Sequence, residues 1–224
     1  GRFVERTVES MESAVALFSE TLERVSCGGG MSFPYAPGEE AFDLEGFTDT
    51  WLAARDRWSC ELGRPLTLEA EPGRLLVADA GVLLTEVCGM KSTGREGATF
   101  LLVDAGFHSM IRPLLYGAFH RISTLAEDDR PTTPKMVAGP LCESADVFTQ
   151  GKEGAPAPQA LPDMERGELL MIHDVGAYGA AMASCYNSRS LPAEVVIGDD
   201  GAASLARPAI NPNHQLELEK ELLP

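Results

Sequence analysis

Two runs that contain glycine stand where short β-type segments end, and both hold residue types suited to binding. The first is Gly28-Gly29-Gly30, which follows residues 24–27. Three adjacent glycines leave backbone N–H groups bare, so a phosphate or another anion can approach them closely. Short glycine motifs are also common in simple loops. The triplet alone therefore leaves open whether this is an anion site or a turn.

The second run is Glu71-Pro72-Gly73-Arg74, which follows residues 65–69. It places a carboxylate, a rigid turn, a bare backbone and a guanidinium within four positions. Functional groups of an α/β barrel gather at the carboxyl ends of its strands. The two runs are therefore candidates for one site. A turn-capping ion pair between Glu71 and Arg74 is the structural alternative.

Three further segments carry side chains that could bind a carboxylate or an ammonium group. Arg112 offers a planar fork suited to a carboxylate, and Tyr116 adds a hydroxyl four residues later. Cys142 beside Glu143 could be a proton donor next to an anchor for an ammonium group, and Tyr178 lies in a glycine-flanked segment. The structural alternatives are an arginine stem that covers apolar surface, a small buried thiol and a core tyrosine.

The elements that must position these residues differ between the two parts of the chain. Apolar spacings of three and four predict helices over residues 3–23 and 47–62, each followed by one of the short strands. This order is typical of a parallel α/β unit. Short β-type runs replace helical periodicity farther along, at residues 82–87, 99–103, 135–138, 147–149, 169–172 and 195–197.

These patterns predict two domains, an α/β region over residues 1–74 and a β-domain over residues 75–224. Asp199-Asp200-Gly201 is a predicted hairpin turn because the Asp-Gly dipeptide favours one. Residues 151–162 hold three prolines and predict an exposed loop, and residues 214–223 predict a short acidic helix.

Charge and composition exclude several classes of partner. The 224 residues include 18 Lys and Arg against 34 Asp and Glu, a formal net charge of −16. A nucleic-acid module needs a basic stripe, so we expect no nucleic-acid partner. No apolar run approaches the ~18 residues of a membrane span, and we expect a cytoplasmic protein with no membrane contact. Five cysteines without a C-x-x-C pair predict neither a disulfide framework nor a metal site.

The motifs GGG, EPGR, VDAG with RPLLY, GPLCES, and GAYG with YNSR occur in this order. Together they resemble the fold-type III pyridoxal-phosphate decarboxylases, the family that acts on diaminopimelate, ornithine and arginine, and in particular its diaminopimelate branch. The resemblance extends over residues 4–207. It implies a TIM-type barrel, of the kind found in alanine racemase, followed by a β-domain. Residues 1–74 would then be the C-terminal remnant of that barrel.

The resemblance also implies the cofactor pyridoxal 5'-phosphate and residues that bind it. Glu71 would face the pyridine nitrogen, because a carboxylate there keeps the nitrogen protonated. Tyr178 would close over the cofactor and the substrate. The cofactor phosphate would be held by Gly28, Gly29, Gly30, Gly73 and Arg74.

The implied reaction is decarboxylation of meso-2,6-diaminopimelate to L-lysine and CO₂, the last step of lysine biosynthesis. By similarity, Arg74, Arg112 and Tyr116 would bind the distal carboxylate of this substrate. Cys142 would return a proton to the α-carbon and Glu143 would receive the distal ammonium, both contributed by the second subunit of a homodimer. The ornithine group has Asp at the position of Glu143, which favours the diaminopimelate branch.

One essential group is missing from the sequence. Pyridoxal phosphate must be held as an imine with a lysine, and none of the four lysines, Lys91, Lys135, Lys152 and Lys220, has the Y-x-x-K-A context of the family. A TIM barrel also takes about 250 residues. We therefore expect the C-terminal part of a longer reading frame, inactive by itself. The alternatives are a natural truncated or catalytically inactive regulatory homologue, and a decarboxylase for ornithine, arginine or a D-amino acid. His108, where Asn is usual, is a departure from the family pattern.

Overall fold

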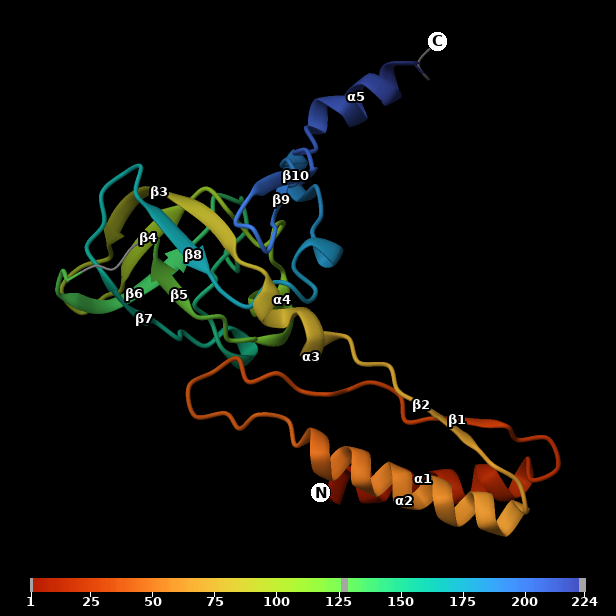
Figure 1. Ribbon diagram of the computed structural model, residues 1–224. Coiled ribbons are helices and arrows are strands. Elements are labelled where there is room, and N and C mark those ends of the chain that lie inside the picture. The colour runs from red at the N-terminus through yellow and green to blue at the C-terminus, as the bar shows by residue number, and fades with distance from the viewer. Residues whose placement is uncertain (1, 126–128, 222–224) are drawn as a thin grey trace. The chain divides into compact units, whose positions relative to one another are not determined.

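The computed structural model describes residues 2–125 and 129–221, with the side chains of Arg2, His214, Gln215 and Leu218 left aside (Figure 1). The chain divides into two compact units, Gly1–Leu76 and Val77–Pro224. Among the described residues, no helix combines the length and the apolar character that crossing a membrane requires.

The first unit has the predicted order of helix, strand, helix and strand. Its strands pair in parallel, with Ser26 opposite Glu69. A short further helix follows them at the boundary between the units. The elements are α1 (Arg2–Leu17), β1 (Arg24–Ser26), α2 (Leu44–Leu62), β2 (Thr67–Glu69) and α3 (Arg74–Val77).

Packing between α1 and α2 builds the core of this unit. The apolar stripe of α1 is buried at Val4, Val8 and Val15, and α2 buries Trp51 and Trp58 in the same cluster. Each large apolar side chain buried in this way contributes roughly 1.5–3 kcal/mol. The amphipathic spacing seen in the sequence is thus the spacing that this core requires.

Helix α2 begins and ends at defined caps, whereas α1 ends earlier than predicted. The Asp43 side chain accepts from the N–H of Gly46, and Gly63 closes α2 in a left-handed conformation. Helix α1 ends at Leu17 and not at residue 23. The Arg64 guanidinium donates to the carbonyl oxygens of Ser19 and Leu22 at 2.6 and 3.0 Å. These carbonyls are therefore satisfied by a side chain and not by the N–H groups of a further helical turn.

The second unit is built on one six-stranded sheet whose order is β5-β8-β3-β4-β6-β7. Among the described strands of this sheet, only the β4–β6 pair is parallel. The strands are β3 (Leu83–Ser92), β4 (Thr99–Val103), β5 (Ile122–Thr124), β6 (Thr132–Ala138), β7 (Gln159–Pro162) and β8 (Leu169–Ile172).

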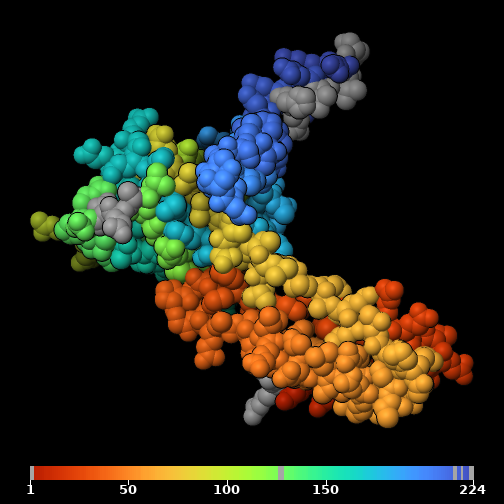
Figure 2. Space-filling view, in the orientation of Figure 1, coloured from red at the N-terminus to blue at the C-terminus, as the bar shows by residue number. Residues whose placement is uncertain are grey.

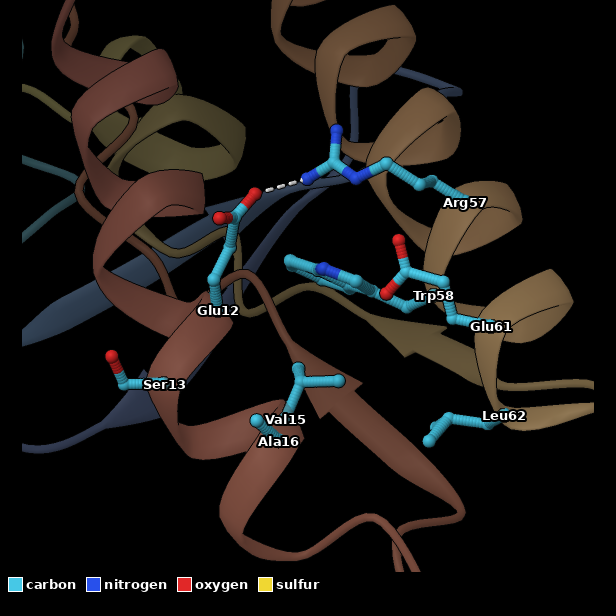
Figure 3. A pocket seen from close by; sticks show the side chains of 8 residues that line it. All are labelled: Glu12, Ser13, Val15, Ala16, Arg57, Trp58, Glu61 and Leu62. Carbon is cyan, nitrogen blue, oxygen red and sulfur yellow. Dashed lines mark hydrogen bonds and ion pairs between the residues drawn. The ribbon is translucent and has the colours of Figure 1, made fainter.

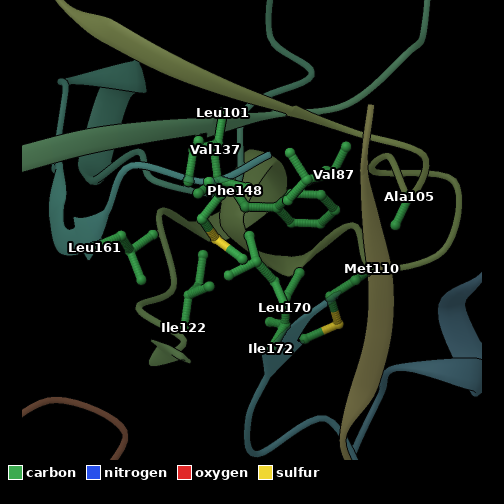
Figure 4. Packing of buried hydrophobic residues seen from close by; sticks show 12 residues of the cluster. Val87, Leu101, Ala105, Met110, Ile122, Val137, Phe148, Leu161, Leu170 and Ile172 are labelled. Atoms are coloured by element: carbon green, nitrogen blue, oxygen red, sulfur yellow. The ribbon is translucent and has the colours of Figure 1, made fainter. Parts of the chain in front are cut away.

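The sheet curls so that its two outermost strands, β5 and β7, are linked. The Gln159 side chain of β7 accepts from the N–H of Ile122 at 2.9 Å and donates to the carbonyl oxygen of His120 at 2.7 Å. One side chain thus satisfies backbone groups that an open edge would leave exposed. The interior of the curl is apolar (Figure 4), and its twelve buried members are Val87, Leu101, Val103, Ala105, Met110, Ile122, Val137, Phe148, Leu161, Met164, Leu170 and Ile172.

Strands β9 (Glu194–Ile197) and β10 (Ala203–Arg207) form a separate antiparallel hairpin. The predicted turn at Asp199-Asp200-Gly201 is confirmed: Gly201 has a φ of 77°, and the N–H of Gly198 donates to Ala202. The hairpin lies at the surface (Figure 2, blue) and exposes Val195, Ile197 and Leu205. The predicted C-terminal helix is α5 (Pro212–Glu221), and the last two positions predicted for it lie outside the described residues.

Two expectations about this unit are wrong. Residues 147–149 make only an isolated bridge, at Val147, because the Thr149 hydroxyl accepts from the N–H of Val137 at 2.8 Å in place of a ladder bond. Residues 151–162 do not end as an exposed loop, since β7 pairs with β6 and buries Leu161. Pro162 disfavours a strand in sequence reasoning, but an edge strand tolerates it.

Short elements between the strands complete the unit. Helix α4 (Arg112–Tyr116), which the sequence reading did not predict, begins with Pro113 in its first turn and ends at Gly117 in a left-handed conformation. Single 3₁₀ turns occur at Ala78–Ala80, Lys152–Gly154, Ala180–Met182 and Tyr186–Ser188.

Candidate functional site

The glycine triplet and Glu71 lie together at the carboxyl ends of β1 and β2. Pairing continues beyond the strands, because the N–H of Glu71 donates to the carbonyl oxygen of Gly28 at 2.9 Å. The Ser26 hydroxyl donates to Glu71 Oε1 at 2.6 Å and accepts from the N–H of Gly28 at 3.0 Å. The parallel pairing therefore brings both sequence motifs to one end of the two-stranded sheet.

The glycines of this end are needed for two different reasons. Gly28 and Gly30 have φ values of 67° and 80°, which residues with a side chain rarely adopt. At Gly29, a Cβ would lie 2.7 Å from the carbonyl oxygen of Glu71. Beyond the adjacent residues, no atom lies within 4 Å of a Cβ placed at Gly28, Gly30 or Gly73, so this side of their backbone has space for a ligand. An open backbone beside a carboxylate suits a molecule with one anionic end and one protonated nitrogen.

In the second unit, Arg112 and Tyr178 come together. Arg112 is only 5% exposed at the start of α4, and its guanidinium carbon lies 5.6 Å from the centroid of the Tyr178 ring. Tyr178 has a φ of 65°, a conformation that costs energy for a residue with a side chain. A buried cation on an aromatic face is a strong receptor for a carboxylate. Tyr116, at the last position of α4, is 58% exposed.

Arg112 also contacts a buried histidine that the sequence reading did not select. His120 is 1% exposed, and its Nε2 lies 3.4 Å from Nη1 of Arg112. Burial and the nearby Arg112 charge together lower the pKa of His120 to about 4, although the hydrogen bond to the His173 carbonyl oxygen acts in the opposite direction. His120 is therefore uncharged at neutral pH.

A single carboxylate holds the loop that carries Cys142 and Glu143. Asp146 is 3% exposed and accepts from the N–H groups of Phe107 at 2.7 Å and of Leu141 at 2.8 Å. Cys142 and Glu143 are exposed on this loop, and Glu143 Oε1 accepts from the N–H of Ala145 at 3.3 Å. Asp146 thus connects the GPLCES motif to the VDAG motif.

The remaining motifs of this unit meet the same loop. The Arg189 guanidinium donates to the carbonyl oxygen of Pro140 at 3.3 Å, and the rings of Phe107 and Tyr186 lie 4.9 Å apart. His108 is buried, which lowers its pKa, and its Nε2 lies 3.2 Å from the Ser109 hydroxyl. The GPLCES loop, the VDAG segment and the YNSR segment therefore form one cluster.

The hollow in Figure 3 contains none of the predicted site residues. It lies between α1 and α2, has a volume of about 480 Å³, and includes the ion pair between Glu12 and Arg57. Trp58, one of the core residues of α2, forms part of its wall. Across the part of the chain that the structure describes, no group of three His, Cys, Asp or Glu side chains could hold a metal ion.

Comparison with known proteins identifies the class. Residues 17–176 match the family described as the pyridoxal-dependent decarboxylase, C-terminal sheet domain. The chain belongs to this family of pyridoxal-dependent decarboxylases, and the sheet of the second unit accords with that description.

Curated relatives specify the branch of the family that this chain is similar to. The diaminopimelate decarboxylase of Escherichia coli is 48% identical over 209 residues, which are 91% of this chain and 49% of the relative. The diaminopimelate decarboxylase of Streptomyces coelicolor is 45% identical over 203 residues, 89% of this chain and 45% of the relative. The chain spans about half the length of the curated relatives it matches.

Solved structures agree with this assignment. A crystal structure of diaminopimelate decarboxylase is 45% identical and has a TM-score of 0.92. The alignment covers 97% of this chain and 52% of the chain in that crystal structure. The diaminopimelate decarboxylase from Helicobacter pylori, complexed with L-lysine, is 32% identical with a TM-score of 0.81. That alignment covers 98% of this chain and 51% of the Helicobacter chain.

Proposed function

We propose that this chain provides part of an enzyme that decarboxylates meso-2,6-diaminopimelate to L-lysine and CO₂. The observation that carries the proposal is the buried Arg112 guanidinium on the Tyr178 ring. Diaminopimelate ends in a second carboxylate, whereas ornithine ends in an amine alone. A buried cation favours the first and repels the second. The names of the relatives in Escherichia coli and Streptomyces coelicolor support the same substrate.

The residues of the first unit fit pyridoxal 5'-phosphate. When bound, this cofactor supplies a ring that accepts the electrons left when CO₂ departs. The open backbone at Gly28, Gly30 and Gly73 would bind its phosphate, together with Gly29 and Arg74. Glu71 would hold a proton on the ring nitrogen, and the Ser26 hydroxyl orients this carboxylate. Two observations support this fit: the backbone N–H groups and the carboxylate lie at the same end of the sheet, and a Cβ would occupy free space at Gly28, Gly30 and Gly73.

Substrate recognition would use Arg112, Tyr116 and Arg74 around the distal carboxylate. Arg112 supplies a preorganised fork, because burial limits its conformations. The exposed hydroxyl of Tyr116 would add a donor from the same helix. Tyr178 would cover the bound substrate while its ring supports Arg112.

Cys142 and Glu143 would act in the active site of a second copy. Both are exposed on a loop that Asp146 holds in place, so they are available to a partner subunit. Cys142 would deliver a proton to the α-carbon after CO₂ leaves, and Glu143 would bind the distal ammonium. The proposal therefore includes a homodimer with shared active sites.

The lysine that binds the cofactor would come from polypeptide outside these residues. All four lysines lie in the second unit, and Lys135 is buried in an ion pair with Asp163 at 2.5 Å. Strands β1 and β2 form only a two-stranded parallel sheet, and parallel strands normally lie in larger, covered sheets. We propose that residues 1–74 complete a TIM-type barrel whose other strands carry that lysine.

The test uses a completed chain, in which the N-terminal half of the Escherichia coli relative precedes residue 1. We expect this protein to release CO₂ from diaminopimelate and not from ornithine. The Arg112→Met variant should lower kcat/KM for diaminopimelate by about 100-fold, the equivalent of about 3 kcal/mol for a charge-assisted pair.

Arg130→Met is the matched control, because this partly exposed arginine pairs with Glu168 on the sheet surface. It should change kcat/KM by less than twofold. Equal turnover of ornithine and diaminopimelate would show that Arg112 does not select a distal carboxylate. An imine absorbance without release of CO₂ from any substrate would instead favour the inactive homologue.

A further inference from the structure

We propose that His120 is a positioning residue that holds the Arg112 guanidinium in place and thereby tightens selection for a distal carboxylate. The inference rests on the proposed function, and it adds a residue that the sequence motifs do not include. His120 would not touch the substrate, since it acts through Arg112.

The hydrogen-bond partners of His120 define which ring nitrogen carries the hydrogen. Nδ1 lies 2.9 Å from the backbone carbonyl oxygen of His173, which can only accept. Nδ1 therefore donates, and in an uncharged imidazole Nε2 is then an acceptor. Nε2 lies 3.4 Å from Nη1 of Arg112, which can only donate. The direction of the chain is thus Arg112 to His120 to the His173 carbonyl.

His120 and His173, the acceptor side of this hydrogen-bond chain, are both anchored to the sheet. The N–H of His173 donates to the carbonyl oxygen of Arg121 at 2.9 Å, next to the β5–β8 pair. The Gln159 side chain holds the carbonyl oxygen of His120 at 2.7 Å from the other edge, in β7. His120 therefore sits where the sheet closes, and its ring has little freedom to move.

The charges around His120 favour its accepting form. Arg112 faces Nε2, and a protonated ring would oppose one cation with another. On the other side, the His173 ring is occupied by Arg121 at 2.8 Å and by the Ser123 hydroxyl at 2.8 Å. Burial and the Arg112 charge keep the pKa of His120 near 4, so the acceptor is present throughout the neutral range.

Positioning matters because an arginine side chain has many rotamers. The guanidinium carbon of Arg112 lies 5.6 Å from the centroid of the Tyr178 ring, a cation–π contact that does not by itself fix the directions of the guanidinium N–H groups. The acceptor at His120 Nε2 fixes the direction of one of these N–H groups, so less conformational entropy is lost when a carboxylate binds. A substrate without a distal carboxylate gains nothing from this arrangement.

The first test is spectroscopic and does not require activity. In ¹⁵N NMR of the completed chain labelled at histidine, one imidazole should show the uncharged form with hydrogen on Nδ1 from pH 8 down to about pH 5. The His120→Gln variant should lack this signal. A His120 signal with hydrogen on Nε2, or a charged ring at pH 6, would overturn the assignment.

The second test separates KM from kcat. His120→Leu should raise KM for diaminopimelate at least tenfold with kcat changed less than threefold, because the proton-transfer groups are untouched. His120→Gln, whose amide can donate and accept, should recover KM to within threefold of the parent. Leu170→Ala is the stability control, since it removes a fully buried core residue and should leave KM unchanged.

The outcomes distinguish this inference from the proposed function. Absence of diaminopimelate turnover in the unmodified completed chain would overturn the proposed function itself. Normal turnover with an unchanged KM in His120→Leu would overturn only the role of His120. If His120→Leu does not fold, the His120→Gln variant and the NMR signal decide the question.

Discussion

Asp146 should be the residue whose loss most disturbs the loop that carries Cys142 and Glu143. Its buried carboxylate accepts from two backbone N–H groups, those of Phe107 and Leu141. Asparagine has the same shape but only one oxygen, and its NH₂ group would face one of these donors. One charge-assisted bond is lost and one buried N–H is left unsatisfied, which together cost about 2–4 kcal/mol.

Close packing around Asp146 prevents a replacement side chain from rotating to restore the lost hydrogen bond. A Cβ at Gly139 would lie 2.2 Å from Asp146 Oδ2, and a Cβ at Gly106 would lie 2.8 Å from the same atom. Both glycines thus pack directly on the carboxylate. A replaced side chain can rotate only by displacing this backbone, so the loop itself should loosen.

Hydrogen exchange measures the effect where it occurs. In the Asp146→Asn variant, the amides of Phe107 and Leu141 should lose about 30-fold of their protection, which corresponds to about 2 kcal/mol. Urea unfolding of the second unit should shift by a similar free energy. Asp199→Asn is the control, because Asp199 is exposed in the hairpin turn. Unchanged protection at both amides would refute the reasoning.

Two further predictions concern pH and the cofactor. The pKa of His120 is about 4 in the folded protein and near 6.5 when unfolded, so the unfolded state binds the extra proton. The contribution of His120 to the free energy of unfolding should therefore be complete above pH 6.5, and it should fall by up to about 3 kcal/mol toward pH 4. Urea titrations of the His120→Gln variant should not show this pH-dependent loss. Gly29→Ala should weaken binding of pyridoxal phosphate to the completed chain at least tenfold in an absorbance titration, because the new Cβ would press on the carbonyl of Glu71. Gly89→Ala is the control, because beyond the adjacent residues no atom lies within 4 Å of a Cβ placed there. Equal affinity of the two variants for the cofactor would contradict the proposed phosphate site.

The periodic elements could be predicted because local spacing alone encodes them. The apolar stripe that buries Val8 and the spacing that buries Trp58 each require one helical face. Residues 99–103 and 169–172 are strands with the predicted bounds, since each is a short apolar run between turn residues. The strand β5 was missed because its sequence, Ile-Ser-Thr, holds a single apolar residue, and β7 was missed because Pro162 argues against a strand.

Some residues of the candidate site could be predicted from the sequence and others could not. Gly29 and Glu71 could be placed together from sequence, because the carboxyl ends of adjacent parallel strands share one edge. Asp146 and His120 could not be selected, since each has a decisive partner far along the chain, Phe107 at 39 residues and the His173 carbonyl at 53 residues. Asp146 follows the GPLCES motif closely, which was the only signal for it, and His120 had none.

Residue types and their order by themselves determined the chemistry available to this protein: bare glycine backbone, a carboxylate, a guanidinium and a thiol, in the order typical of one decarboxylase family. Only the tertiary structure decided that Arg112 is buried on Tyr178 and bonded to an uncharged His120. The physical reason is that burial and charge depend on which distant segments pack together. Here the pairing of β5 with β8 brings together the segment before β5, which holds Arg112 and His120, and the segment after β8, which holds Tyr178.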